Sequence, residues 1–160
     1  MKRLFATAMM GAALVGVVAP ATNASAVVTD DQSFLIYGRD DGPATVVATG
    51  PVSGVGIDDE SDTGEAAEFV FGGGHISVLH PPETDDFRLN EHTCVAVDRF
   101  TGTYSLVGGT GAYAGIRGAG TYRGKSILAF SRRPEGSCAV DDLPVMSFFL
   151  VRAVGTTTLP

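Results

Sequence analysis

Short runs of apolar residues recur along the chain, and clusters of glycine, proline and aspartate separate them. Side chains on a strand alternate between its two faces, so such runs are typical of strands that bury one face. Many short β-rich runs divided by turn residues indicate an all-β barrel or sandwich. The predicted strands cover residues 34–37, 45–49, 68–71, 75–80, 93–97, 103–107, 121–131 and 144–154.

Three further stretches complete this pattern. Residues 51–57 are expected to prolong the second strand, with a bend at their glycines. Residues 58–64 and 81–86 are rich in aspartate, glycine and proline and are predicted to be turns.

The densest feature is the glycine-rich stretch 106–122, between two of the predicted strands. A helix loses roughly 1 kcal/mol for each glycine relative to alanine, so this stretch cannot form a stable helix. Glycine tolerates positive φ and close approach of another backbone, which predicts a corner between strands. The glycines are Gly108, Gly109, Gly111, Gly115, Gly118 and Gly120.

Two nucleotide-binding motifs overlap this stretch, and neither fits. The glycines at 109, 111 and 115 are spaced somewhat like a dinucleotide fingerprint, which needs a following helix and an acidic residue about 20 positions later. Further glycines forbid that helix, and no acidic residue lies between Asp98 and Glu135. Residues 119–126 resemble a relaxed phosphate-binding loop, but a β-like run follows where a helix must begin.

The segment Val107-Gly-Gly-Thr-Gly-Ala-Tyr-Ala-Gly-Ile-Arg-Gly118 resembles a glycine-rich signature of dirigent proteins and the matching segment of allene oxide cyclases. The resemblance covers residues 101–124, and small secreted actinobacterial proteins look similar. It implies an eight-stranded antiparallel β-barrel, often a homotrimer, with an apolar cavity for a hydrophobic small molecule. The eight predicted runs match that barrel. The catalytic acidic and arginine positions of the family lie outside the matched segment, so none is carried over.

The N-terminus has the three parts of a secretory signal peptide. Lys2 and Arg3 precede an apolar run over residues 4–18, and Ala24-Ser-Ala26 supplies the small residues of a cleavage site. The apolar run is too short to span about 30 Å of hydrocarbon. We therefore expect residues 1–26 to be removed, leaving a single secreted domain over residues 27–160.

The acidic composition narrows the range of partners. The chain carries 18 acidic against 11 basic residues and a net charge of −7. Phosphates of nucleic acids and anionic membrane surfaces would be repelled, so neither is expected as a partner. No motif indicates a cofactor.

Cys94 and Cys138 are the two cysteines. An even number in an exported chain predicts one disulfide, whereas a redox pair would have Cys-x-x-Cys spacing. A loop of this size would stabilise the fold by roughly 3–4 kcal/mol in the chain-entropy model.

The alternation of side chains predicts which residues face the barrel interior. Tyr104, Tyr122 and His80 are the polar groups on the predicted inner face, whereas Arg123 and Lys125 point to solvent. The three inner residues are the candidate ligand-binding residues, each able to orient a molecule in an apolar cavity. The simpler explanation is that they are core aromatics with satisfied polar tips. Arg152, in the last run, is either an inward cation or a surface residue.

Metal binding and catalysis find little support. His75 and His80 fall on opposite faces of one strand, so they cannot share an ion. The acidic cluster at residues 58–62 is spaced like a calcium loop but lacks the glycine at loop position six, and a solvated hairpin tip explains it. No serine, cysteine or threonine nucleophile has a recognisable setting, so catalytic residues stay unassigned.

The final run does not alternate cleanly. Met146, Phe148 and Leu150 share one face, and Phe149 and Val151 share the other. We expect one face to line the barrel and the other, taken to be that of Phe149, to form part of a homo-oligomer interface.

The leading hypothesis is therefore a secreted β-barrel that binds or guides a hydrophobic small molecule. The alternatives are a cyclase or isomerase built on the same barrel, which needs an inward acid or base, and a structural protein whose barrel is filled by side chains.

Overall fold

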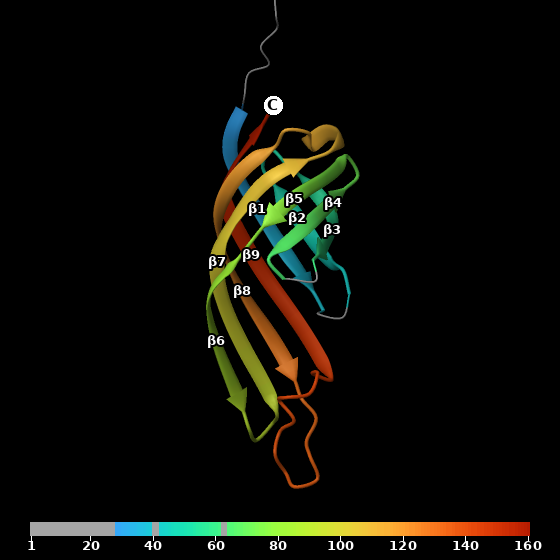
Figure 1. Cartoon of the computed structure of the whole chain (residues 1–160), viewed down its shortest axis with the longest axis vertical. Coiled ribbons are helices and arrows are strands. Elements are labelled where there is room, and N and C mark those ends of the chain that lie inside the picture. Colours follow the sequence, from blue (N-terminus) through green and yellow to red (C-terminus); the bar gives the residue numbers. More distant parts are fainter. Residues whose placement is uncertain (1–27, 40–41, 62–63) are drawn as a thin grey trace, which may run out of the picture.

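The computed structural model describes residues 28–39, 42–61 and 64–160, which form one antiparallel sheet of nine strands and a short 3-10 turn (Figure 1). No helix in this part of the chain has the length and apolar character needed to cross a membrane. The predicted signal peptide lies outside the described residues. The elements are β1 (Val28–Gly38), β2 (Ala44–Thr49), β3 (Gly54–Glu60), β4 (Ala66–Phe71), β5 (Gly74–Leu79), β6 (Pro82–Asn90), β7 (Val95–Gly109), η1 (Gly111–Tyr113), β8 (Arg117–Ala129) and β9 (Met146–Leu159).

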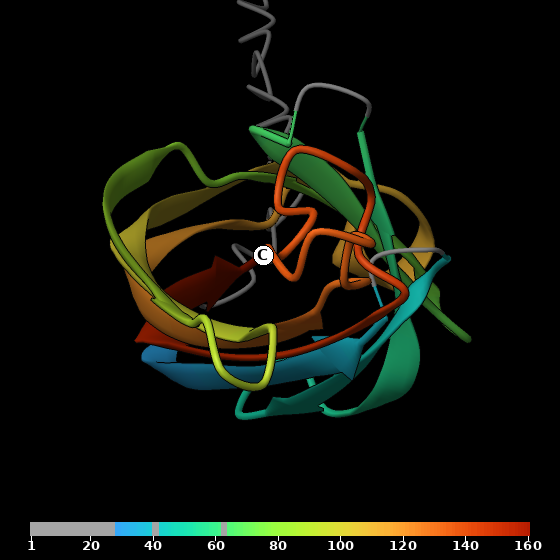
Figure 2. The same cartoon turned by 90° about the horizontal axis from the view of Figure 1, so that it is seen from below.

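Eight of these strands close into a barrel. The sheet order is β5-β4-β3-β2-β1-β9-β8-β7-β6, and β5 also pairs with the second half of β7. That extra pairing completes the ring, which Figure 2 shows from below. β6 pairs with the first half of β7 and lies outside the closed ring. The predicted all-β, eight-stranded antiparallel barrel is confirmed.

The strand boundaries differ from the prediction in three places. Residues 54–60 do not prolong β2 but turn back to form β3, which pairs with β2. The predicted runs 93–97 and 103–107 belong to the single strand β7. The predicted turn at residues 81–86 is largely strand β6. The additional strand β3 and the merging of two runs into β7 offset each other, and β6 lies outside the ring, so the barrel still has eight strands.

Apolar side chains fill the inner face at one end of the barrel. Ile76, Leu106 and Ile116 are fully or almost fully buried there. The 3-10 turn η1 covers this end, since the ring of Tyr113 meets that of Phe71 edge-on at 5.8 Å. Gly111 makes the corner possible because it has φ of +58° and a Cβ would lie 2.2 Å from a backbone oxygen. The predicted glycine corner is thus real, although Gly118 and Gly120 already belong to β8.

The glycines of β8 make room for aromatic rings on the inner face. Gly120 pairs with Gly155 of β9, and the ring of Tyr104 lies over this pair. Gly124 likewise lies under the ring of Phe100. The absence of a Cβ lets large rings stand close to the barrel wall.

The disulfide is formed between Cys94 and Cys138, with Cα atoms 5.4 Å apart. It joins the β6–β7 hairpin to the long connection between β8 and β9 at the lower end of the molecule (Figure 1). Arg132 adds to this link by donating hydrogen bonds to the carbonyl oxygens of Glu91 and His92. The predicted cysteine pairing is therefore confirmed.

The face assignment of β9 corrects the sequence prediction. Phe149 and Val151 face inward and pack against the core. Met146, Phe148 and Leu150 face outward and are exposed. Because both faces of this strand are apolar, hydrophobicity alone could not fix its orientation, and Phe149 is not the surface residue that we expected.

Gly120→Ala should destabilise the barrel. The added Cβ would lie 2.2 Å from the Val154 carbonyl oxygen and 2.6 Å from the Tyr104 ring. Such overpacking lowers the free energy of unfolding by about 1–3 kcal/mol. The control is Gly72→Ala, because a Cβ there meets no atom within 4 Å. Urea unfolding that gives equal free energies for the two variants would contradict this packing.

Candidate functional site

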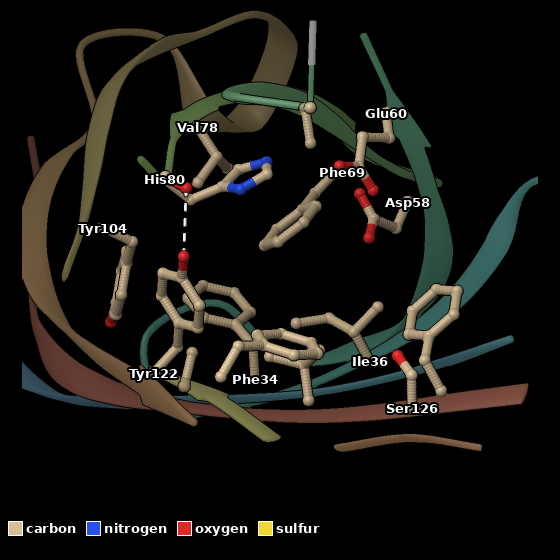
Figure 3. Close-up of a pocket in the computed structure, with 16 residues that line it drawn as sticks. Phe34, Ile36, Asp58, Glu60, Phe69, Val78, His80, Tyr104, Tyr122 and Ser126 are labelled. Carbon is tan, nitrogen blue, oxygen red and sulfur yellow. Dashed lines mark hydrogen bonds between the residues drawn. The ribbon is translucent and has the colours of Figure 1, made fainter. Parts of the chain in front are cut away.

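The barrel encloses a cavity of about 270 Å³. Its lining comes from both halves of the ring, so residues far apart in the sequence converge on it (Figure 3). Most of the lining is apolar, and six of its side chains are Phe or Tyr rings. The lining residues are Phe34, Ile36, Asp58, Glu60, Gly64, Ala67, Phe69, Val78, His80, Phe100, Tyr104, Tyr122, Ser126, Phe149, Val151 and Ala153.

All three candidate ligand-binding residues line this cavity. Tyr104 and Tyr122 are buried, and His80 is partly buried. Arg123 and Lys125 point to solvent, as the alternation predicted. The structure thus places these two tyrosines and this histidine in the lining of one cavity.

The polar atoms of the two tyrosines are differently engaged. The Tyr122 hydroxyl lies 3.2 Å from the carbonyl oxygen of His80 and 3.3 Å from that of Pro81, to which it donates (Figure 3). The Tyr104 hydroxyl is buried and has no hydrogen-bond partner among the described residues. It lies against the backbone of Gly155, and burial raises the pKa of this phenol. Tyr122 therefore fits the simpler explanation best, that of a core aromatic with a satisfied tip.

The most unusual lining residue is Asp58, which was predicted from the sequence to lie in a solvated hairpin tip. That placement is wrong, because Asp58 lies on β3 with its side chain inside the barrel, only 8% exposed. Figure 3 shows its carboxylate pointing toward the cavity, next to that of Glu60. Within the described part of the chain, its Oδ1 atom has no hydrogen-bond partner.

The orientation of β3 explains why Asp58 was missed. Asp58 pairs with Ala44 of β2 and with Phe69 of β4, whose side chains both face inward. Val55 and Ile57 consequently point outward and are 68% and 50% exposed. An apolar pattern would predict the reverse orientation. The available signal was the pair of glycines at 54 and 56, which share the inward face with Asp58.

The environment of Asp58 changes its ionisation. Burial away from water, then the charges of Glu60 and Asp59, raise the pKa of the Asp58 carboxyl from 3.8 to about 7. At neutral pH this group can therefore either donate or accept a proton, which is the behaviour of an acid–base residue.

A second hollow, the outer pocket, adjoins the cavity. It has a volume of about 520 Å³ and shares Asp58, Glu60 and Phe149 with the cavity lining. Its remaining lining is Arg39, Gly42, Pro43, Ala44, Asp59 and Ser61. Asp58 and Glu60 thus lie where the apolar interior meets a polar surface pocket.

The other sequence candidates lie away from this cavity. His75 points outward and lies 3.3 Å from the carboxylate of Glu68, so it shares no site with His80. Arg152 is an exposed surface residue. No group of three or more potential metal ligands exists in the described residues. Asp62, part of the rejected calcium-loop pattern, lies outside them.

The chain was also compared with known proteins. No family model, no curated protein and no solved structure matches it.

Asp58→Asn should change how stability depends on pH. From about pH 4 to pH 7 the folded protein keeps a proton on Asp58 that the unfolded chain has lost. The folded state binds more protons, so wild-type stability falls as pH rises through this window, on the order of 4 kcal/mol in total. Asparagine cannot ionise, so the variant escapes this loss.

Urea unfolding at pH 4.5 and pH 8 measures the effect. The free energy of Asp58→Asn relative to wild type should increase at the higher pH. Asp31→Asn, at an exposed position of β1, is the matched control and should follow wild type. Parallel behaviour of all three proteins would contradict the buried state of Asp58.

Proposed function

We propose that this protein binds a mainly apolar small molecule inside its barrel. The observation that carries the proposal is the cavity of about 270 Å³, with aromatic and aliphatic walls and a few polar groups. Small-molecule sites have this composition, in which apolar walls give affinity and isolated polar groups orient the ligand.

The size of the cavity weighs against a barrel filled by its own side chains. Native cores contain few voids larger than a water molecule. An engineered apolar cavity of about 150 Å³ is large enough to bind benzene. The cavity in this barrel exceeds that volume, so it can hold at least a small aromatic or aliphatic compound.

Asp58 is the observation that favours the catalytic alternative. A cyclase or isomerase on this barrel needs an inward acid or base, and a carboxyl with a pKa of about 7 is suited to proton transfer at neutral pH. His80, the other titratable side chain of interest, also lines the cavity. Binding is the simpler proposal because it requires only the cavity, whereas catalysis also requires a substrate placed against Asp58.

Export is part of the proposal. The three-part N-terminal pattern predicts a signal peptide that ends at Ala26, and the Cys94–Cys138 disulfide is typical of proteins in oxidising compartments. The resemblance of the glycine corner to dirigent proteins and allene oxide cyclases is consistent with a barrel that holds hydrophobic molecules.

Self-association stays a prediction, but the residues expected at the interface are now those on the outward face of β9. The exposed apolar side chains of β9 are Met146, Phe148 and Leu150. Tyr37 of β1 pairs with Leu150 and is exposed beside it. An interface on this strand, in a homotrimer or another homo-oligomer, would use this outward face.

Ala153→Phe should abolish ligand binding by filling the cavity. Ala153 is buried in the lining, whereas its neighbour Val154 points outward from the same strand. Val154→Phe therefore adds the same ring outside the barrel and is the matched control.

Isothermal titration with 3-phenylpropan-1-ol, an uncharged probe, measures this effect. Wild type and Val154→Phe should show saturable 1:1 binding, and Ala153→Phe should show none while keeping its folded circular-dichroism spectrum. Equal binding to both variants would rule out the cavity as the binding site.

A further inference from the structure

When Asp58 is ionised, the inner end of the outer pocket carries negative charge, and no described Lys or Arg lines the cavity beside it. Asp58 is more than nine-tenths buried, points into the cavity, and leaves Oδ1 without a hydrogen-bond partner in the described residues. Buried polar atoms are nearly always paired, so an unpaired oxygen in a carboxylate that lines a cavity is unusual and favours a ligand beside it. Glu60, two residues further along β3, brings a second carboxylate to the same place.

The groups around Asp58 leave this charge uncompensated. Its neighbours across β2 and β4 are Ala44 and Phe69, which carry no charge. Arg39 lines the outer pocket but not the cavity. None of the sixteen cavity-lining residues is Lys or Arg. The titratable groups that face this space are Arg39 before β2, Asp59 and Glu60 of β3, His80 beyond β5, Tyr104 of β7 and Tyr122 of β8.

The aromatic walls supply the other half of the recognition. Six rings line the cavity: Phe34, Phe69, Phe100, Tyr104, Tyr122 and Phe149. The face of an aromatic ring attracts a cation, and several rings together can bind an ammonium group even without a negatively charged side chain. Aromatic rings beside two carboxylates therefore favour a positively charged group that is attached to a hydrocarbon body.

We propose that the ligands of this barrel are apolar molecules bearing a protonated amine, with the ammonium group against Asp58 and Glu60 and the hydrocarbon among the aromatic rings. This inference rests on the proposed function and specifies its ligand class. The ammonium would donate to the Asp58 carboxylate where this side chain meets the cavity.

Other head groups fit this site less well. A carboxylate or phosphate would be repelled by Asp58, Asp59 and Glu60, and the net charge of −7 would disfavour its approach. A neutral alcohol can hydrogen-bond to Asp58 but gains no charge attraction. Only the cation benefits from every feature of the site.

The proposal has a characteristic pH dependence. A bound ammonium stabilises the ionised carboxylate and lowers the pKa of Asp58 from its value of about 7 in the free protein. By linkage, amine affinity must rise as pH increases through 7, because the free protein then no longer holds the competing proton. A decrease of the bound pKa by two units weakens binding roughly twentyfold between pH 8 and pH 5.5.

Three probes with one skeleton and different head groups test this inference. They are 3-phenylpropylamine, 3-phenylpropan-1-ol and 3-phenylpropanoate, titrated calorimetrically into the wild-type protein at pH 8 and pH 5.5. At pH 8 the amine should bind at least tenfold more tightly than the alcohol, and the propanoate should bind most weakly. At pH 5.5 the advantage of the amine should shrink roughly twentyfold.

Asp58→Asn isolates the role of the carboxylate. It should bring the amine affinity down to that of the alcohol and remove its pH dependence, whereas the exposed control Asp31→Asn should retain both. If Asp58→Asn does not fold, the pH dependence of the wild-type protein alone decides the matter.

The outcomes separate the two proposals. Binding of the alcohol without preference for the amine, or tightest binding of the propanoate, overturns the amine inference and leaves the cavity as a binding site. Binding of none of the three probes overturns both.

Discussion

The pairing of β5 with β7 beside the glycine-rich corner is the constraint on which the remaining structure depends. It turns a curved sheet into a ring, and it occurs where glycines allow the backbones to approach each other. Gly109 shows how close this approach is, since a Cβ there would lie 2.7 Å from the carbonyl oxygen of His75. Once the ring is closed, each of its eight strands has one face inside, and the residues on that face must form either a core or a cavity.

The two ends of the ring meet this requirement differently. At the corner, Ile76, Leu106 and Ile116 form a solid core, and η1 covers it. Toward the end of β3, small residues such as Ala67 and Ala153 line the wall, and their size leaves space between the aromatic rings. Asp58 then occupies an inward position of β3. Burial disfavours its ionised form, so the stability of the barrel comes mainly from its other residues. A strand that presents glycine and aspartate inward and valine and isoleucine outward breaks the usual pattern, and such departures tend to mark functional sites.

The sequence was informative where one face of a strand was distinctly apolar. β7 and β8 alternate clearly, so the inward positions of Tyr104, Tyr122 and Leu106 could be predicted, as could the disulfide from the cysteine count. β9 has two apolar faces, so its orientation was not determined by hydrophobicity. β6 contains Asp85, Asp86 and Arg88, which are typical of turns, but it lies outside the closed barrel and needs no apolar face. Asp58 was missed because an acidic run ordinarily favours solvent, and only the register with β2 and β4 places it inside.

The proposed amine site depends most directly on the buried carboxylate of Asp58 and on its response to a bound cation. Carbon-detected NMR of the aspartate side chains can follow its titration in the free protein and with saturating 3-phenylpropylamine. We expect the Asp58 carboxyl to titrate with a midpoint near pH 7 in the free protein and at a clearly lower pH in the complex. A midpoint near that of an ordinary aspartate, about 4, in the free protein would contradict it.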